Sequence, residues 1–435
     1  MSLLQKILFV LVILLSIWLR VYHYSYFPQR GATSDEYTYS FLGTSLLTKG
    51  MPVSWSAFQA YHNREDVIID HIYFPIVSPY FDHPPGYALT LGMFLLGFEQ
   101  EGFTEQKLET IRLFPILMTT LTGIILFFLI KREYSFAAAL LTLVLYSTVT
   151  IFVMNQRVSV AENQLALLFV TALLLFSRWK HHLSWQRVFV LGVIAGAAFL
   201  TKILGGVLFV ILLCLFFRNN LSLRQSALLT ASFLLCASLL FVYAALYNWN
   251  LFWEIQGLQS GRDIGPQALW MLVLQPVIVN KVYYDGWYFL GFVSLGFLSR
   301  EYKKHLLLLI PAGVYFFTLL ASLSKTGQSG WYLIPLFPFM AAATSLFLLE
   351  TLRKKSMAFF LVCILVGIPQ LEYFYDSYFG LSPFFYRILL GLLCVPLLLL
   401  ILFKKDQWFG RISVLYLSVM LLTTIAITYR YVHPS

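Results

Sequence analysis

The sequence is poor in charge and in cysteine. Only 11% of its 435 residues are charged, whereas 59% are hydrophobic, a balance that a water-soluble domain cannot keep in solution. The four cysteines all stand inside apolar runs, which argues against a disulfide framework or a zinc ribbon. A GxGxxG turn is also missing, and with it the usual signal of a soluble nucleotide-binding unit. These absences predict a polytopic membrane protein.

Long apolar runs recur along the chain. A spanning helix needs about 20 mostly apolar residues to cross about 30 Å of hydrocarbon, where the backbone must be helical. The alternating pattern of a β-barrel is absent. We predict an all-α protein with thirteen spans, over residues 3–22, 112–130, 135–153, 160–177, 188–201, 203–217, 226–246, 286–299, 305–322, 331–350, 357–370, 386–403 and 411–428.

Basic residues mark one side of this layout. With a cytoplasmic amino terminus, 17 of the 30 Lys and Arg fall in seven short cytoplasmic segments, as the positive-inside rule requires. Acidic residues show the reverse bias. The net charge of +10 therefore reflects topology, and we expect no nucleic-acid partner. The first apolar run lacks a small-residue cleavage site, so it predicts an uncleaved anchor.

The segment 23–111 is the longest loop, and on this topology it is extracytoplasmic. It holds ten of the 20 acidic residues and no cysteine. Two helices are expected in it, over 35–49 and 84–98. The first can lie in the membrane interface, and two prolines fit the first turn of the second. Since no second soluble domain follows, we predict one membrane domain over residues 1–435.

Two adjacent carboxylates, Asp35 and Glu36, open the first of these helices. Thr33 with Glu36 fits a capping box, Ser34 is an alternative cap, and acidic side chains suit a first turn. The local sequence leaves a structural and a chemical role open for the pair.

Cations stand at the outer ends of the spans. Arg157 precedes the fourth span and Glu162 opens it, Lys202 lies between two apolar runs, and Lys325 lies at the mouth of the tenth span. Lys or Arg at a helix centre costs about 2.5 to 3.5 kcal/mol to insert, so such residues usually face a cavity or a partner. Lys202 could instead snorkel from a helix end. The outer face thus presents carboxylates and three cations around one membrane-level site.

Five motifs follow one another along the chain: DEYTY (35–39), FDHPP (81–85), the Arg157 and Glu162 pair, GAAFLTK (196–202), and Lys325 followed by WYLIPLFP. In this order and placement the chain resembles the glycosyltransferases of family 39 and their relatives, which include the protein O-mannosyltransferases and the lipid A aminoarabinose transferases. The resemblance runs from about residue 3 to residue 340. It implies the GT-C fold and sugar transfer, with inversion, from undecaprenyl or dolichyl phosphate to an extracytoplasmic acceptor.

The resemblance also implies roles for individual residues. The Asp of the family's first loop matches Asp35, the expected general base, while the neighbouring Glu36 orients the loop, binds sugar hydroxyls or caps the helix. The groups expected at the donor phosphate, where cations would stabilise the leaving group, are Arg157, Lys202, Lys325 and His83. The groups expected to contact substrate are Tyr39, Asp82, Glu162 and Tyr332.

No cofactor follows from this chemistry, and a divalent metal stays open. The residues that could hold one, without any fixed ligand spacing, are His62, His71, Asp82 and His83. The expected partners are the lipid bilayer, the lipid-linked donor and a protein, lipid or glycan acceptor. We expect a monomer in the plasma membrane, the bacterial inner membrane, with the carboxy terminus outside.

Other function classes stay open. A transporter or flippase of a lipid-linked or anionic substrate would use Lys202, Glu162 and Asp35 as intramembrane charges, although the two halves show no symmetry and the charges stand at one face. A lipid-linked glycan ligase or polymerase would share the polyprenyl chemistry on another fold. With no soluble domain expected after the last span, acceptor contacts fall to the outer loops 247–285 and 371–385, whose aromatics mostly favour an interfacial belt.

Overall fold

The computed structural model describes residues 1–29, 31–69, 72–219, 222–261, 263–265, 267, 269, 285–324, 330–375, 382–402 and 406–431. The helices of its first half outside the long loop are α1 (Leu3–Val21), α4 (Leu108–Glu133), α5 (Phe136–Thr148), α6 (Thr150–Gln156), α7 (Ala161–Trp179), α8 (Trp185–Thr201), η2 (Ile203–Gly206), α9 (Val207–Arg218), α10 (Leu223–Tyr247) and α11 (Trp249–Ser260). Those of the second half are α13 (Gly286–Leu298), η3 (Ser299–Glu301), α14 (Tyr302–Ser322), η4 (Gly330–Leu336), α15 (Phe337–Lys354), α16 (Phe359–Val362), η5 (Cys363–Gly367), α17 (Ile368–Tyr375), α18 (Pro383–Leu402) and α19 (Asp406–Arg430).

The long loop folds into a small layer at one end of the bundle. Its elements are α2 (Asp35–Lys49), β1 (Ser54–Trp55), β2 (Arg64–Ile69), β3 (Ile72–Val77), α3 (Gly86–Leu96) and η1 (Phe103–Glu105). The strands form an antiparallel sheet in the order β1-β3-β2, with Ser54 opposite Val77. We did not predict this sheet. The helix expected over 84–98 is shorter than predicted, because Pro85 stands at its N-cap and not inside its first turn.

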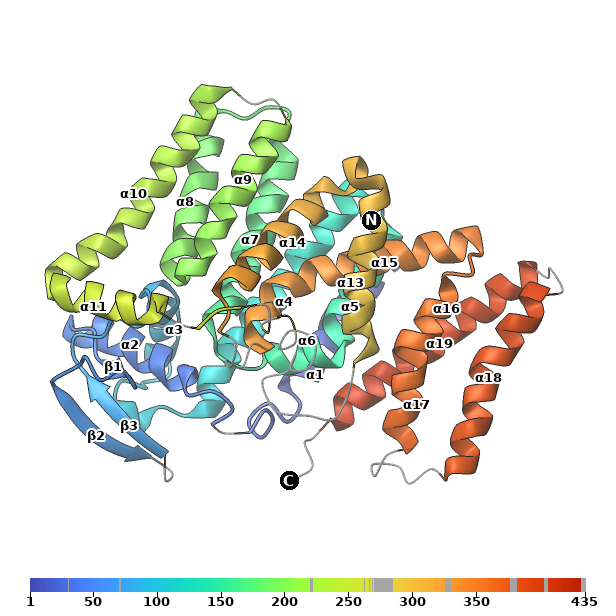
Figure 1. Ribbon diagram of the computed structural model, residues 1–435, viewed down its shortest axis with the longest axis horizontal. Coiled ribbons are helices and arrows are strands. Elements are labelled where there is room, and N and C mark those ends of the chain that lie inside the picture. The colour runs from blue at the N-terminus through green and yellow to red at the C-terminus, as the bar shows by residue number, and fades with distance from the viewer. Residues whose placement is uncertain are drawn as a thin grey trace.

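Figure 1 shows how these parts are arranged. The sheet and α2 lie at the lower left, below the long helices α8, α9 and α10, while α16 to α19 form a separate group at the right. The share of buried residues differs between the middle of the bundle and the group α16 to α19. In the span that includes α15, 83% of the most apolar window is buried, against 6% in α18. The bundle is therefore centred on α15, and α18 exposes an apolar surface suited to lipid.

The chain is a multi-pass membrane protein. Seven described helices are long and apolar enough to cross a bilayer. The number rises to eight if α5 and α6, bent by 63° at the break between them, count as one span. Four shorter apolar helices accompany them. The predicted number of thirteen is not confirmed; the stretch Gly286–Ser322, expected as two spans, counts here as one.

The loop layer is fastened to the bundle through α3. Gly43 of α2 meets α3 so closely that a Cβ there would lie 1.9 Å from the carbonyl oxygen of Ala88. On the other side of α3, the Tyr87 hydroxyl lies 2.8 Å from that of Ser159. Thr90 donates to Gln164 at 2.7 Å, and Gln164 donates to Thr201 at 3.0 Å. These bonds place α2 and α3 against the start of α7 and the end of α8.

The close approach of α2 and α3 yields a stability prediction. Gly43→Ala forces a methyl group into the backbone of α3, and overpacking of this kind costs about 1 to 3 kcal/mol. We expect a lower midpoint of thermal unfolding for the purified protein in detergent. Gly313→Ala in α14 is the matched control, because the added Cβ meets no described atom outside its own helix within 4 Å and Ala favours a helix. Equal midpoints for both variants would contradict the packing described.

Candidate active site

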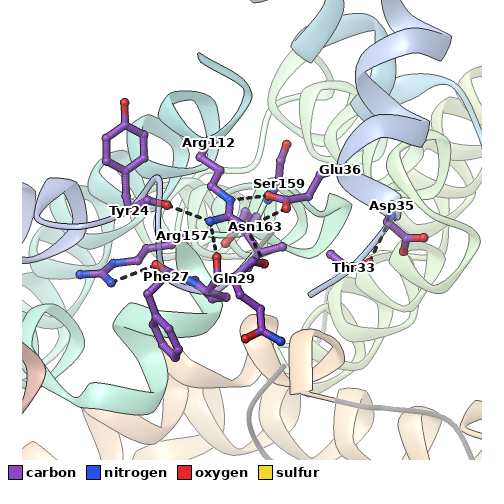
Figure 2. Close-up of polar contacts among 12 residues, drawn as sticks. Tyr24, Phe27, Gln29, Thr33, Asp35, Glu36, Arg112, Arg157, Ser159 and Asn163 are labelled. Carbon is purple, nitrogen blue, oxygen red and sulfur yellow. Dashed lines mark hydrogen bonds and ion pairs between the residues drawn. The ribbon is translucent and has the colours of Figure 1, made fainter. Parts of the chain in front are cut away.

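The two carboxylates at the start of α2 point in opposite directions (Figure 2). Glu36 is fully buried and forms a bidentate ion pair with Arg112 of α4, with both N–O distances at 2.9 Å. The same carboxylate accepts the backbone N–H of Ser159 at 3.0 Å. Asp35 is half-buried, and its own N–H donates to the hydroxyl of Thr33 at 3.2 Å. The Glu36 carboxylate is therefore used in an ion pair, whereas the Asp35 carboxylate points away from that ion pair.

The expected capping box is wrong for a physical reason. A capping box needs the Glu36 carboxylate to reach back to its own helix start, but Arg112 and Ser159 occupy that carboxylate. Ser34 stands at the N-cap without a side-chain bond. Arg112 also donates to the carbonyl oxygens of Tyr24 and Pro28, at 2.8 and 2.5 Å. Glu36 is thus a positioning residue that joins α2 to α4 and to the chain after α1.

Arg157 is likewise directed at the backbone and not at an open site. Its guanidinium donates to the carbonyl oxygens of Leu19, Tyr22 and Phe27, at 2.6, 2.7 and 3.1 Å, and only 1% of the residue is exposed. A phosphate could reach it only if these bonds broke. We therefore remove Arg157 from the residues expected to bind the donor phosphate.

Lys202 lies in the break between α8 and η2, where its backbone is extended. Its ammonium forms an ion pair with Glu162 of α7, with Nζ 2.5 Å from Oε1, and lies 4.3 Å from the centre of the Tyr332 ring. The side chain is 11% exposed, so it does not snorkel to water, as one sequence interpretation held. The second Glu162 oxygen, Oε2, is buried without a hydrogen-bond partner among the described residues.

Tyr39 joins the loop layer to this ion pair. Its fully buried ring stacks on His83 at 5.1 Å and meets Tyr87 edge-on. Burial raises the pKa of Tyr39 well above its ordinary value, and the negative charges of Asp35 and Glu162 add to the effect. The phenol therefore stays protonated and can donate. Within the described part of the chain its hydroxyl has no partner.

The electrostatic contacts bring several predicted residues to one place. The negative charge of Asp35 lies close enough to influence the ionisation of both Tyr39 and Lys202. The Tyr332 side chain influences the same two groups. The Asp82 carboxylate, in contrast, holds the segment between β1 and β2, since it accepts bonds from Ser56 and Tyr61 at 2.6 and 2.7 Å. Lys325 and His71 lie outside the described residues. His62 is exposed, and in the described ranges no three His, Cys, Asp or Glu gather as a metal site would need.

Comparisons with known proteins bear on the fold of the chain. A family model described as dolichyl-phosphate-mannose-protein mannosyltransferase matches residues 82–252, and no curated protein sequence matches the chain. The crystal structure of ArnT from Cupriavidus metallidurans bound to undecaprenyl phosphate is similar with a TM-score of 0.61 and 17% identity, over 99% of this chain and 77% of that one. The chain has the GT-C fold of membrane glycosyltransferases.

Two further solved structures share the GT-C fold with this chain. Archaeal oligosaccharyltransferase AglB from Archaeoglobus fulgidus, in complex with an inhibitory peptide and a dolichol-phosphate, gives a TM-score of 0.53 at 12% identity, over 100% of this chain and 57% of that one. Arabinosyltransferase EmbB from Mycobacterium smegmatis gives 0.57 at 14% identity, over 99% and 41%. The resemblance drawn from the motifs is confirmed. The chain covers a smaller share of AglB and EmbB than of ArnT.

Sequence reasoning missed two buried arginines, Arg112 at the site and Arg20 in α1. Arg112 was placed at the edge of a predicted span and given no partner, and Arg20 was included in the first span without comment. Arg20 is fully buried and donates to the carbonyl oxygen of Tyr146 at 2.9 Å. A guanidinium inside an apolar run was the available signal, because such a charge needs an acceptor within the protein.

The Glu36–Arg112 pair yields a second stability prediction. Glu36→Gln leaves the buried Arg112 guanidinium uncompensated, and breaking a buried pair costs about 3 to 5 kcal/mol. We expect a clear fall in the thermal unfolding midpoint. Glu109→Gln, at an exposed position in the first turn of the same helix α4, is the control and changes only a dipole contribution of about 0.3 to 1 kcal/mol. Similar midpoints for the two variants would show that the pair does not hold α2.

Proposed function

We propose that this chain transfers a sugar from a polyprenyl phosphate to an acceptor hydroxyl on the extracytoplasmic side, with inversion at the anomeric carbon. In this reaction the acceptor oxygen attacks the anomeric carbon and Asp35 takes up the acceptor's proton. The bond from the anomeric carbon to the phosphate oxygen breaks, and polyprenyl phosphate leaves. Lys202 stabilises the charge that develops on that phosphate. The amino terminus is cytoplasmic in this proposal, and the membrane is the bacterial inner membrane.

One observation carries the proposal: the buried Lys202 ammonium, in the break after α8, is held 2.5 Å from Glu162, and the half-buried Asp35 carboxylate of the loop layer lies near enough for its charge to reach that ammonium. The Lys202 ammonium has three N–H donors, and one of them is directed at Glu162. Two donors are left for a ligand as far as the described residues show. Tyr39, kept protonated by its surroundings, is a further donor for a sugar or phosphate oxygen.

The comparisons support the choice of donor. The ArnT structure holds undecaprenyl phosphate and the AglB structure holds a dolichol-phosphate, and the matching family model carries the name of a dolichyl-phosphate-mannose enzyme. A lipid-linked phosphate is the chemistry that these descriptions share. For the acceptor, the segments 247–285 and 371–385 remain our proposal, and both lie partly outside the described residues.

The role of Asp35 can be tested directly. Asp35→Asn removes the proposed base and should lower the transfer rate by about 10² to 10⁴, the usual contribution of a positioned general base. Purified protein is supplied with a panel of radiolabelled polyprenyl-phosphate sugars, and the loss of label from the lipid is followed. Asp66→Asn is the control, because Asp66 is an exposed carboxylate of the same loop that accepts only from Tyr73 among the bonds described.

Two outcomes would count against the assignment. Full turnover by Asp35→Asn would remove Asp35 from the role of base while leaving the transferase intact. If the wild-type protein uses no lipid-linked donor, and instead moves the labelled lipid across liposome membranes, the transporter or flippase class replaces the transferase.

The role of Lys202 requires a binding measurement. Lys202→Met together with Glu162→Gln removes both charges, so neither is left buried without its partner. We expect at least about thirtyfold weaker binding of undecaprenyl phosphate, since losing a buried charge contact costs about 2 kcal/mol or more. Binding is followed by tryptophan fluorescence. Lys354→Met, which changes an exposed lysine paired with Glu350, should bind as the wild type does. Equal affinity in all three proteins would exclude Lys202 as a phosphate ligand.

A further inference from the structure

A second site lies at the end of the bundle that carries the short basic connections. A hollow of about 300 Å³ opens between the ends of α4, α7 and α9 and the start of α14. Its charged lining residues are Lys180, Arg218, Lys303, Lys304 and Glu133. None of these residues takes part in the proposed transfer, whose groups lie at the opposite ends of α7 and α8.

The hollow has an excess of positive charge. Lys180 pairs with Glu133 at 3.1 Å, so those two charges compensate each other. Lys304 reaches Glu301 only at 3.5 Å and both side chains are more than half exposed. Arg218 and Lys303 form no ion pair within the described part of the chain. Their guanidinium and ammonium groups therefore stand beside a concave space without a compensating carboxylate.

The position of the two lysines on α14 strengthens the case for an anion. Lys303 and Lys304 lie in the first turn of this helix; that turn contains no acidic residue, and the carboxylate at the helix end is the exposed Glu301 at the N-cap. The amino-terminal end of a helix has a partial positive charge, so cations there are disfavoured and anions are favoured. Topology alone accounts for basic residues in this connection, but it does not account for their convergence on a hollow. An anion bound there would relieve both repulsions.

Apart from Asn219, the remaining lining is apolar. Phe176, Leu215, Leu306 and Leu307 contribute to the same hollow, and on the outside of α9 the neighbouring Phe217 is 66% exposed. A ligand that fits must therefore have an anionic head and an apolar part that continues along the helices. A free inorganic anion would use only half of this lining.

We propose that this hollow binds the phosphate headgroup of an anionic membrane lipid, with the beginning of its acyl chains against Phe176 and the leucines. Basic pockets between spanning helices suit such headgroups. The site is separate from the proposed transferase site and does not depend on it. Its occupancy would fix the ends of four helices relative to one another.

The test compares lipid retention by the full chain in native mass spectrometry. Phosphatidylglycerol and phosphatidylcholine with identical acyl chains are added to the detergent-purified protein, and the fraction of lipid-bound protein is measured. Arg218→Gln with Lys303→Gln should weaken phosphatidylglycerol binding about twenty-fivefold, since each basic side chain near a headgroup contributes about fivefold. Arg224→Gln is the control, because this exposed cation lies near the same end but does not line the hollow.

Each outcome decides the proposal. Selective loss of phosphatidylglycerol in the double variant, with phosphatidylcholine and the control unchanged, supports it. Equal retention by the double variant and the wild type overturns it, as does equal binding of the two lipids. Displacement by inorganic phosphate at the same concentration would assign the hollow to a soluble anion and also overturn it. If the double variant unfolds at a lower temperature, Lys303→Glu alone, at an exposed position, replaces it with the same expectations.

Discussion

The ion pair between Glu36 and Arg112 is the constraint on which the outer half of the structure depends. It is fully buried and bidentate, and such a pair is favourable only when its geometry is good and its remaining atoms are satisfied. Arg112 meets that condition by donating to Tyr24 and Pro28, and Glu36 by accepting from Ser159. The chain after α1, the start of α2, the helix α4 and the segment before α7 are therefore held at one point. Asp35, one residue away, is fixed in position by the same contacts.

A second set of contacts carries this order from the loop to the membrane helices. Helices α2 and α3 meet backbone to backbone at Gly43. From α3, Thr90 donates to Gln164, and Gln164 donates to Thr201, the residue before Lys202. The Asp35 carboxylate is thus positioned by α2 and the Lys202 ammonium by the end of α8, and both elements are connected to α3. Such preorganisation is what electrostatic catalysis requires, because donors that are already oriented need no rearrangement during the reaction.

The sequence predicted the class of fold but not how its charges are used. Hydropathy and the positive-inside rule identify membrane helices because the bilayer imposes length and polarity on each segment independently. Helix α2 was predicted with its observed bounds. Partners that are 76 residues apart, such as Glu36 and Arg112, leave no local pattern. The sequence therefore leaves loop orientation, sugar binding and helix capping all open for Glu36, and it places Arg157 at a phosphate. The three-stranded sheet was missed because its strands are short and lie in a loop that was interpreted through its acidic residues and histidines.

The ion pair of Lys202 and Glu162 has a consequence for the proposed reaction. Glu162 stabilises the charged form of the buried Lys202 ammonium. Seen from a distance, the negative charge of Glu162 cancels most of that positive charge. The pair therefore attracts a singly charged phosphate diester only at close range. When the sugar leaves, the phosphate gains negative charge while Asp35 gains a proton. The total charge of the site stays constant, but its centre moves toward Lys202. An interaction that strengthens in this way during bond breaking lowers the barrier more than it tightens substrate binding.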